Sequence, residues 1–132
     1  MPSGSMSMEI AVGDEVRPSL LISIIAQVAG VTLVRGPLET DRASVLAGMF
    51  KALGDPVRLR LLSMIASTPK GEICVCDLSG EFDLTGPTIS HHLRILREAG
   101  LVDCDRRGTW VYYRPVPDAL TLLADVLDVS PS

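Results

Sequence analysis

Two of the three cysteines in the sequence, Cys74 and Cys76, are separated by one residue. Their thiolates are soft ligands that suit thiophilic ions and also accept zinc or cadmium. On a regular α-helix, side chains two residues apart project about 200° from each other, whereas in an extended segment they point the same way. If a helix begins at Cys74, ion capture must therefore unwind or distort its first turn. The helix N-terminus should also help to ionise the thiols.

The alternative for this pair is structural, because free cysteines are commonly small buried hydrophobic residues. Three cysteines are too few for a disulfide framework, so all are expected to be free thiols in a reducing cytosol. Residues 20–34, the longest apolar run, include polar side chains and fall short of the roughly 20 apolar residues of a membrane span. Acidic residues stand where a secretory leader would carry positive charge. We therefore expect a cytoplasmic protein with no membrane segment.

The charge distribution indicates one basic region on an acidic chain. The net charge is −4, but residues 88–114 contain five arginines against three acidic residues, a local balance of +2. A local basic surface is compatible with binding of double-stranded DNA, which the total charge alone would not suggest.

A helix that could present these arginines, called the reader helix below, is expected from Thr85, a good N-terminal cap, to Gly100. Helical spacing gives it an apolar face, on which His92 is expected to be a hydrogen-bonded core residue. A short helix over about residues 74–81 precedes it, and two helices joined by a tight connection form a helix-turn-helix. The other residues of the apolar face are Ile89, Leu93, Leu96 and Ala99, and those that point elsewhere are Thr88, Ser90, His91, Arg94 and Arg97.

Further helices and two strands complete the expected architecture. Arg106, Arg107 and Gly108 are expected to form the tip of a β-hairpin. The fold class is mainly α with a small β-hairpin: a winged helix-turn-helix domain over residues 40–132, with an N-terminal extension over residues 1–39. The expected helices cover residues 18–30, 40–54, 55–68 and 117–129, and the strands cover residues 101–105 and 109–114.

Four segments of the sequence carry a resemblance to a known family. They are FKALGDPVRLRLLSMI (50–65), EICVCDL (72–78), LTGPTISHHLRILREAGLV (84–102) and RRGTWVYYR (106–114). Through them the sequence resembles the ArsR/SmtB family of metal-responsive repressors over about residues 40–120. The resemblance implies a homodimer built on the N- and C-terminal helices, operator binding through the helix-turn-helix and wing, and release on metal capture. No cofactor is required for DNA binding.

The resemblance also implies an inducer. The family's arsenite sensors carry the segment Cys-Val-Cys-Asp-Leu, which residues 74–78 reproduce, so arsenite or antimonite is expected to bind Cys74 and Cys76, with cadmium as an alternative. Ser79 stands where some arsenite sensors have a third cysteine, and a hydroxide or a small thiol could complete the site. Cys104, in the first wing strand, is the remaining candidate ligand, unless it is a core residue. Residues 1–40 lack the cysteines of the cadmium and lead sensors, and the last expected helix lacks the histidine of a zinc site.

Residues of the reader helix and the hairpin tip are expected to contact DNA. Arg106 and Arg107 are placed to reach phosphate or an adjacent minor groove, although an ordinary charged turn would have the same sequence. Short hydroxyls and a bidentate arginine suit major-groove and phosphate contacts, and on the reader helix these are Thr88, Ser90, His91 and Arg94.

Two other classes of protein fit parts of the pattern. A thiol-redox enzyme is opposed by the Cys-x-Cys spacing and by the lack of a βαβ pattern, so no enzymatic activity is expected. A winged-helix dimer that binds proteins instead of DNA would suit the acidic total charge. Among repressors, cadmium, lead or redox signals are alternatives to arsenite. Dimerisation is expected because the apolar faces near residues 45–53 and 120–127 exceed what a small winged-helix core can cover.

Overall fold

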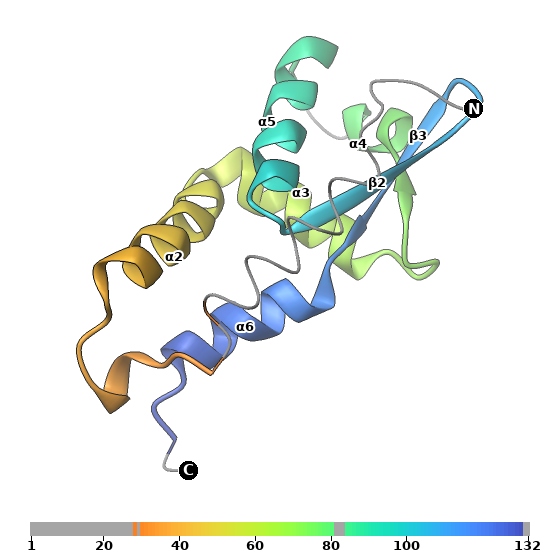
Figure 1. Ribbon diagram of the computed structural model, residues 1–132. Helices are drawn as coiled ribbons and strands as arrows, with labels where there is room; N and C mark the ends of the chain where they lie inside the picture. Colours follow the sequence, from red (N-terminus) through yellow and green to blue (C-terminus); the bar gives the residue numbers. More distant parts are fainter. Residues whose placement is uncertain (1–27, 29, 81–83, 131–132) are drawn as a thin grey trace.

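The computed structural model describes residue 28 and residues 30–80 and 84–130. The expected helix over residues 18–30 and most of the N-terminal extension lie outside these residues. The order of elements confirms the predicted winged helix-turn-helix (Figure 1). In chain order the elements are η2 (Leu33–Arg35), α2 (Thr40–Leu53), α3 (Pro56–Ser67), β1 (Ile73–Cys74), α4 (Val75–Ser79), α5 (Gly86–Glu98), β2 (Val102–Arg107), β3 (Trp110–Pro115) and α6 (Pro117–Leu127).

Polar caps fix the start of α3 and of α5, the reader helix. Oδ2 of Asp55 accepts a hydrogen bond from the amide of Arg58 (3.3 Å), and Oγ1 of Thr85 accepts one from the amide of Thr88 (3.3 Å). Each helix has a proline in its first turn, where an amide hydrogen would have no partner within the helix, so the missing hydrogen of proline costs no hydrogen bond. The cap at Thr85 is the one predicted from the sequence.

The core is formed by aliphatic side chains around α3, which contacts α2, α5 and β3. In Figure 1, α2 and α6 extend from this core on the side away from the hairpin tip. No helix in the part of the chain that the structure describes is long and apolar enough to cross a membrane. The largest fully buried side chains are Leu61, Ile65, Leu78, Ile89, Leu93, Leu96, Leu101, Val28 and Val126.

The sheet has three antiparallel strands in the order β1-β3-β2, one more than the predicted hairpin. The added strand, β1, pairs Ile73 with Tyr113 and Cys74 with Tyr112. A two-residue strand has no alternating pattern long enough to detect, and the sequence predicts that Cys74 already belongs to a helix. This strand joins the segment before α4 to the wing.

The hairpin loop is shorter than the sequence predicts. Arg106 and Arg107 are not in the loop, because they are the last two residues of β2 and pair with residues of β3. The loop consists of Gly108 and Thr109, and Gly108 has a φ of 64°, in the left-handed region that a two-residue hairpin turn requires. The two arginines therefore have positions fixed by the sheet.

Arg58 joins three helices through polar contacts. Its Nε donates to the carbonyl of Ala52 at 2.6 Å, and its Nη2 donates to that of Lys51 at 3.3 Å, both at the end of α2. Its Nη1 donates to Nδ1 of His92 on α5 at 3.3 Å. The same Nδ1 of His92 lies 3.9 Å from Oδ2 of Asp55. His92, with a side chain 16% exposed, is the inward hydrogen-bonded residue that the sequence predicts. Arg58 thus satisfies carbonyls at the end of α2 and fixes α5 against it.

Replacing Arg58 with alanine should destabilise the fold, because the carbonyl of Ala52 and the ring of His92 would each lose a hydrogen-bond partner. A polar group left unsatisfied in this way costs about 1–3 kcal/mol of the free energy of unfolding. Urea unfolding followed by circular dichroism would measure the loss. Arg60→Ala, at an exposed position of the same helix, is the matched control. Equal losses in the two variants would contradict this role of Arg58.

Candidate thiol site and nucleic-acid interface

The thiols of Cys74 and Cys76, called the thiol pair below, meet at the junction between β1 and α4. Cys74 ends β1 and is the N-terminal cap residue of α4, with an extended backbone (φ −72°, ψ 142°). Cys76 lies in the first turn of α4, and its Sγ donates to Sγ of Cys74 at 2.8 Å. Cys74 is buried and Cys76 is exposed. One extended and one helical residue thus bring together two side chains that a regular helix would hold apart.

This junction corrects the expected effect of ion capture on α4. The helix begins at Val75 rather than at Cys74, so its first turn need not unwind for both sulfurs to approach one ion. The physical reason is the pairing of β1 with β3, which keeps Cys74 extended.

The pKa of Cys76 is raised from its ordinary value, chiefly by its hydrogen bond to Cys74 and then by desolvation. The negative charge of Asp77 acts in the same direction. A hydrogen bond from the backbone at Asp77 lowers this pKa, as expected near a helix N-terminus, but the causes that raise it outweigh this contribution. The raised pKa favours the protonated thiol of Cys76. A metal cation such as cadmium would have to displace this proton, so affinity for such a cation rises with pH.

Cys104 lies on the other face of the sheet from the thiol pair. In the register, Cys104 is aligned with Tyr113 and Ile73, whereas Cys74 is aligned with Tyr112 in the neighbouring row. Aligned residues share a face and successive residues alternate, so Cys104 is on the face of the buried Tyr113. Its Sγ accepts a hydrogen bond from Nη1 of Arg97 on α5 at 3.5 Å. The structure thus brings Cys74 and Cys76 together and does not bring Cys104 to them.

A cavity of about 590 Å³ lies beside the thiol pair. Its walls are the turn at residues 68–70, the thiol pair, and Trp110 and Tyr112 of β3. Trp110 is 53% exposed, so the cavity is bordered by an aromatic side chain at the surface. Among the described residues, no group of three or more histidine, cysteine or acidic side chains could hold a metal ion. A small ion or molecule can reach both sulfurs here, with two protein ligands to receive it.

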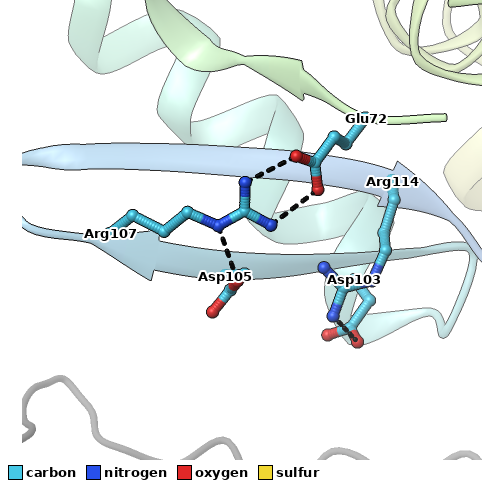
Figure 2. A network of polar contacts seen from close by, with 5 residues as sticks. All are labelled: Glu72, Asp103, Asp105, Arg107 and Arg114. Carbon is cyan, nitrogen blue, oxygen red and sulfur yellow. Dashed lines mark hydrogen bonds and ion pairs between the residues drawn. The ribbon is translucent and has the colours of Figure 1, made fainter. Parts of the chain in front are cut away.

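A charged network lies on the same face of the sheet as Cys74 (Figure 2). Nη1 and Nη2 of Arg107 donate to the two oxygens of Glu72 at 2.5 and 2.8 Å, and Nε donates to Oδ2 of Asp105 at 3.0 Å. The guanidinium of Arg107 lowers the pKa of Glu72 below its usual value. Sequence reasoning missed Glu72, because no motif singles it out and only the register of β1 against β3 brings it to the wing.

The candidate DNA contacts of the reader helix lie together on its outer face. Ser90, His91 and Arg94 are exposed, and Thr88 is partly buried. Nη2 of Arg94 donates to Nδ1 of His91 at 3.1 Å, and the hydroxyl of Thr88 bonds to that of the cap residue Thr85 at 2.9 Å. This face offers hydroxyl, imidazole and guanidinium groups to solvent.

The two arginines at the end of β2 point to different sides of the sheet. Arg106 is exposed and shares a face with Cys104, the face that α5 contacts through Arg97. Arg107 alternates to the face of the charged network and the thiol pair. Of the two residues predicted to contact DNA from the hairpin tip, only Arg106 therefore lies on the side of the reader helix.

Comparison with known proteins places the chain among transcriptional regulators. Residues 55–103 match the family model described as bacterial regulatory protein, arsR family. Over 82 residues the chain is 43% identical to an uncharacterized HTH-type transcriptional regulator of Methanocaldococcus jannaschii, covering 62% of this chain and 90% of that protein. Over 80 residues it is 40% identical to the arsenical resistance operon repressor of Escherichia coli, covering 61% and 67% of the two chains. Over 91 residues it is 36% identical to the biofilm growth-associated repressor of Agrobacterium fabrum, covering 69% and 75%.

Solved structures have the same fold. A possible transcriptional regulator for arsenical resistance superposes with a TM-score of 0.53 at 35% identity, over 58% of this chain and 77% of that chain. The transcriptional repressor BigR from Xylella fastidiosa superposes with a TM-score of 0.51 at 32% identity, over 64% and 85%.

Proposed function

The chain belongs to the ArsR family of transcriptional regulators, and from that membership we propose that it is a repressor that leaves its operator when the thiol pair captures a thiophilic ion. Proteins of this family bind DNA, so the chain acts in transcription rather than in catalysis. Arsenite, or antimonite of the same chemistry, is the inducer that we favour, because several relatives are regulators or repressors of arsenic resistance. Cadmium is the alternative inducer.

The observation that carries this proposal is the 2.8 Å approach of the two sulfurs beside a cavity. Arsenite has three oxygens on arsenic, and each thiol replaces one of them and releases it as water. Two As–S bonds form without oxidation or reduction, and the third position keeps a hydroxide or takes a small thiol. Thiolates suit such a soft ion better than oxygen ligands do.

The coupling to DNA follows from the position of the pair at the start of the helix-turn-helix. Cys76 is in α4, and α5, the reader helix, is the next helix along the chain. An ion that binds the DNA-free form more tightly than the DNA-bound form must weaken DNA affinity by the same factor. Release therefore requires only that the geometry of the two thiols differs between the DNA-free and the DNA-bound form, so that the ion binds the DNA-free form more tightly.

Cys74→Ser and Cys76→Ser should each bind the operator normally and fail to release it with arsenite, because a single thiol cannot form both bonds. In the wild type, arsenite should weaken operator binding by roughly 5–150-fold, the usual range of coupling between two sites. Mobility shifts with and without arsenite, free of dithiol reductants that would compete for the ion, measure this factor. Cys104→Ser is the matched control and should respond like the wild type or slightly less. Normal release by both Cys74→Ser and Cys76→Ser would exclude this mechanism, and full loss of response in Cys104→Ser would make it a ligand.

DNA recognition is proposed for the outer face of α5 together with Arg106. Arg94 and His91 are exposed on this face, and Ser90 adds a hydroxyl. An α-helix that presents such groups fits the major groove, where arginine donates to guanine and short hydroxyls reach bases or phosphate. Arg106, on the side of the sheet that α5 contacts, reaches phosphate beside the groove.

Arg94→Ala should weaken operator binding about tenfold, within the roughly 1–3 kcal/mol of a good arginine contact, and leave the melting temperature unchanged. His92→Ala is the matched control from the inner face, and it should lower the melting temperature because it removes the contact between Arg58 and α5. Operator titrations and thermal unfolding of both variants give the order of effects. The reverse order would mean that the outer face of α5 is not the reading surface.

The apolar faces near residues 45–53 and 120–127, from which dimerisation is predicted, are largely buried within one chain. A homodimer is proposed instead from apolar side chains that are exposed near the two ends of the described domain. They are Leu33 and Val34 in η2, Leu127 at the end of α6, and Val129 two residues beyond it. Sedimentation velocity at micromolar concentration should find a dimer, and Leu127→Asp should shift it toward monomer by placing a charge in the interface. A wild type that is entirely monomeric and still binds its operator would contradict this assembly.

A further inference from the structure

Arg107 stands at the end of β2 with all its nitrogen atoms engaged (Figure 2). Nη1 and Nη2 form a two-point bond with Glu72 at 2.5 and 2.8 Å, and Nε donates to Asp105 at 3.0 Å. The guanidinium carbon also lies 4.6 Å from the ring centroid of Tyr112. A bidentate bond of this kind fixes orientation as well as charge, and the aromatic face adds attraction for the cation.

These contacts reach the thiol-bearing segment at two places. Glu72 directly precedes β1 and stands two positions before Cys74. Tyr112 is the residue of β3 that is aligned with Cys74. A displacement of Cys74 can therefore shift Arg107 by two routes: along the chain through Glu72, and across the sheet through Tyr112.

The surroundings of Arg107 oppose a contact with DNA. Glu72 and Asp105 outweigh its single positive charge, so the three side chains together carry −1 and repel phosphate. Arg107 would have to leave both carboxylates and turn to the other face of the sheet, where Arg106 already lies. Arg106 and Arg107 lie on opposite faces of the sheet because the side chains of successive strand residues alternate between the two faces.

We propose that Arg107 is a positioning residue of the thiol site rather than a DNA contact, and that its pair with Glu72 transmits ion capture to the wing. The inference rests on the proposed function and names the regulation of the same site. When the thiol pair takes an ion, β1 moves, Glu72 moves with it, and the hairpin tip follows through Arg107. Operator affinity changes because Arg106 is carried on the same strand, β2.

The pair suits transmission better than it suits folding stability. Its side chains are 27% and 49% exposed, and ion pairs as exposed as this contribute little to the free energy of unfolding. Removing one partner should therefore leave a folded chain that still binds the ion. What is lost is the coupling between the ion and the operator.

The test measures the coupling factor, which is the ratio of operator affinities without and with arsenite, and separately the affinity for arsenite without DNA. Glu72→Gln and Arg107→Gln should bind the operator within about threefold of the wild type and keep their arsenite affinity to the same extent. Their coupling factor should fall by at least about fivefold, a large part of a typical coupling. Arg107→Lys, which keeps the charge but not the two-point bond, should give an intermediate factor. Arg114→Gln is the matched control, because it removes the 3.3 Å pair with Asp103 on the same face and should keep the wild-type factor.

Salt dependence separates this role from a phosphate contact. The slope of log affinity against log salt should fall by about one unit in Arg106→Gln and stay unchanged in Arg107→Gln. A reduced slope in Arg107→Gln with tighter binding in Glu72→Gln would show that Glu72 merely screens a DNA contact, and would overturn the proposal. An unchanged coupling factor in Glu72→Gln would overturn it too, and this variant suffices if Arg107→Gln does not fold. If arsenite fails to release the wild type, the proposed function fails and this inference with it, whereas a responsive wild type with unaltered variants excludes this inference alone.

Discussion

The pairing of β1 with β3 is the constraint on which the thiol site depends. The register places Cys74 opposite Tyr112 and Ile73 opposite Tyr113. A shift by one residue would turn Cys74 toward the core and Ile73 toward the charged network, because side chains alternate along a strand. The same pairing keeps Cys74 extended and starts α4 at Val75. The two sulfurs therefore meet because a strand ends where a helix begins.

The reading surface is held by different interactions from the thiol site. The inner face of α5 is anchored by buried Ile89, Leu93 and Leu96, and Arg58 ties His92 to the end of α2. None of these residues belongs to β1 or to the charged network. A change at the thiol pair can therefore alter how the wing and α4 lie against α5 without melting α5 itself. This division is consistent with release by a small rearrangement between rigid parts.

The sequence predicts well those features that depend on long patterns or on caps. The apolar spacing of α5, its cap at Thr85 and the inward His92 are all found in the structure. Prediction from the sequence is wrong where a contact between residues distant in the chain decides the local structure. Cys74 has a helical neighbour on one side, and only a partner about 40 residues away in β3 makes it a strand residue. The role of Glu72 could not be predicted for the same reason, because nothing in the sequence distinguishes it from the other acidic residues and only the strand register brings it to Arg107.

The hairpin tip and Cys104 illustrate the same limit. Composition favours a loop at Arg106, Arg107 and Gly108, yet a two-residue turn leaves both arginines in the ladder and assigns them to opposite faces. The face occupied by Cys104 follows from its alignment with Tyr113, which no local pattern contains.

Cys74 is the cap residue of α4, and its side chain makes no cap hydrogen bond. A thiol accepts hydrogen bonds poorly, and serine at a helix N-terminus is worth about 1 kcal/mol more than a residue that cannot cap. Capping of α4 alone would therefore favour serine at position 74, and the cysteine forgoes that contribution. The residue that would hold the ion and the residue that would best cap the helix are thus different at this one position, so helix stability and response to the ion make opposite demands on residue 74.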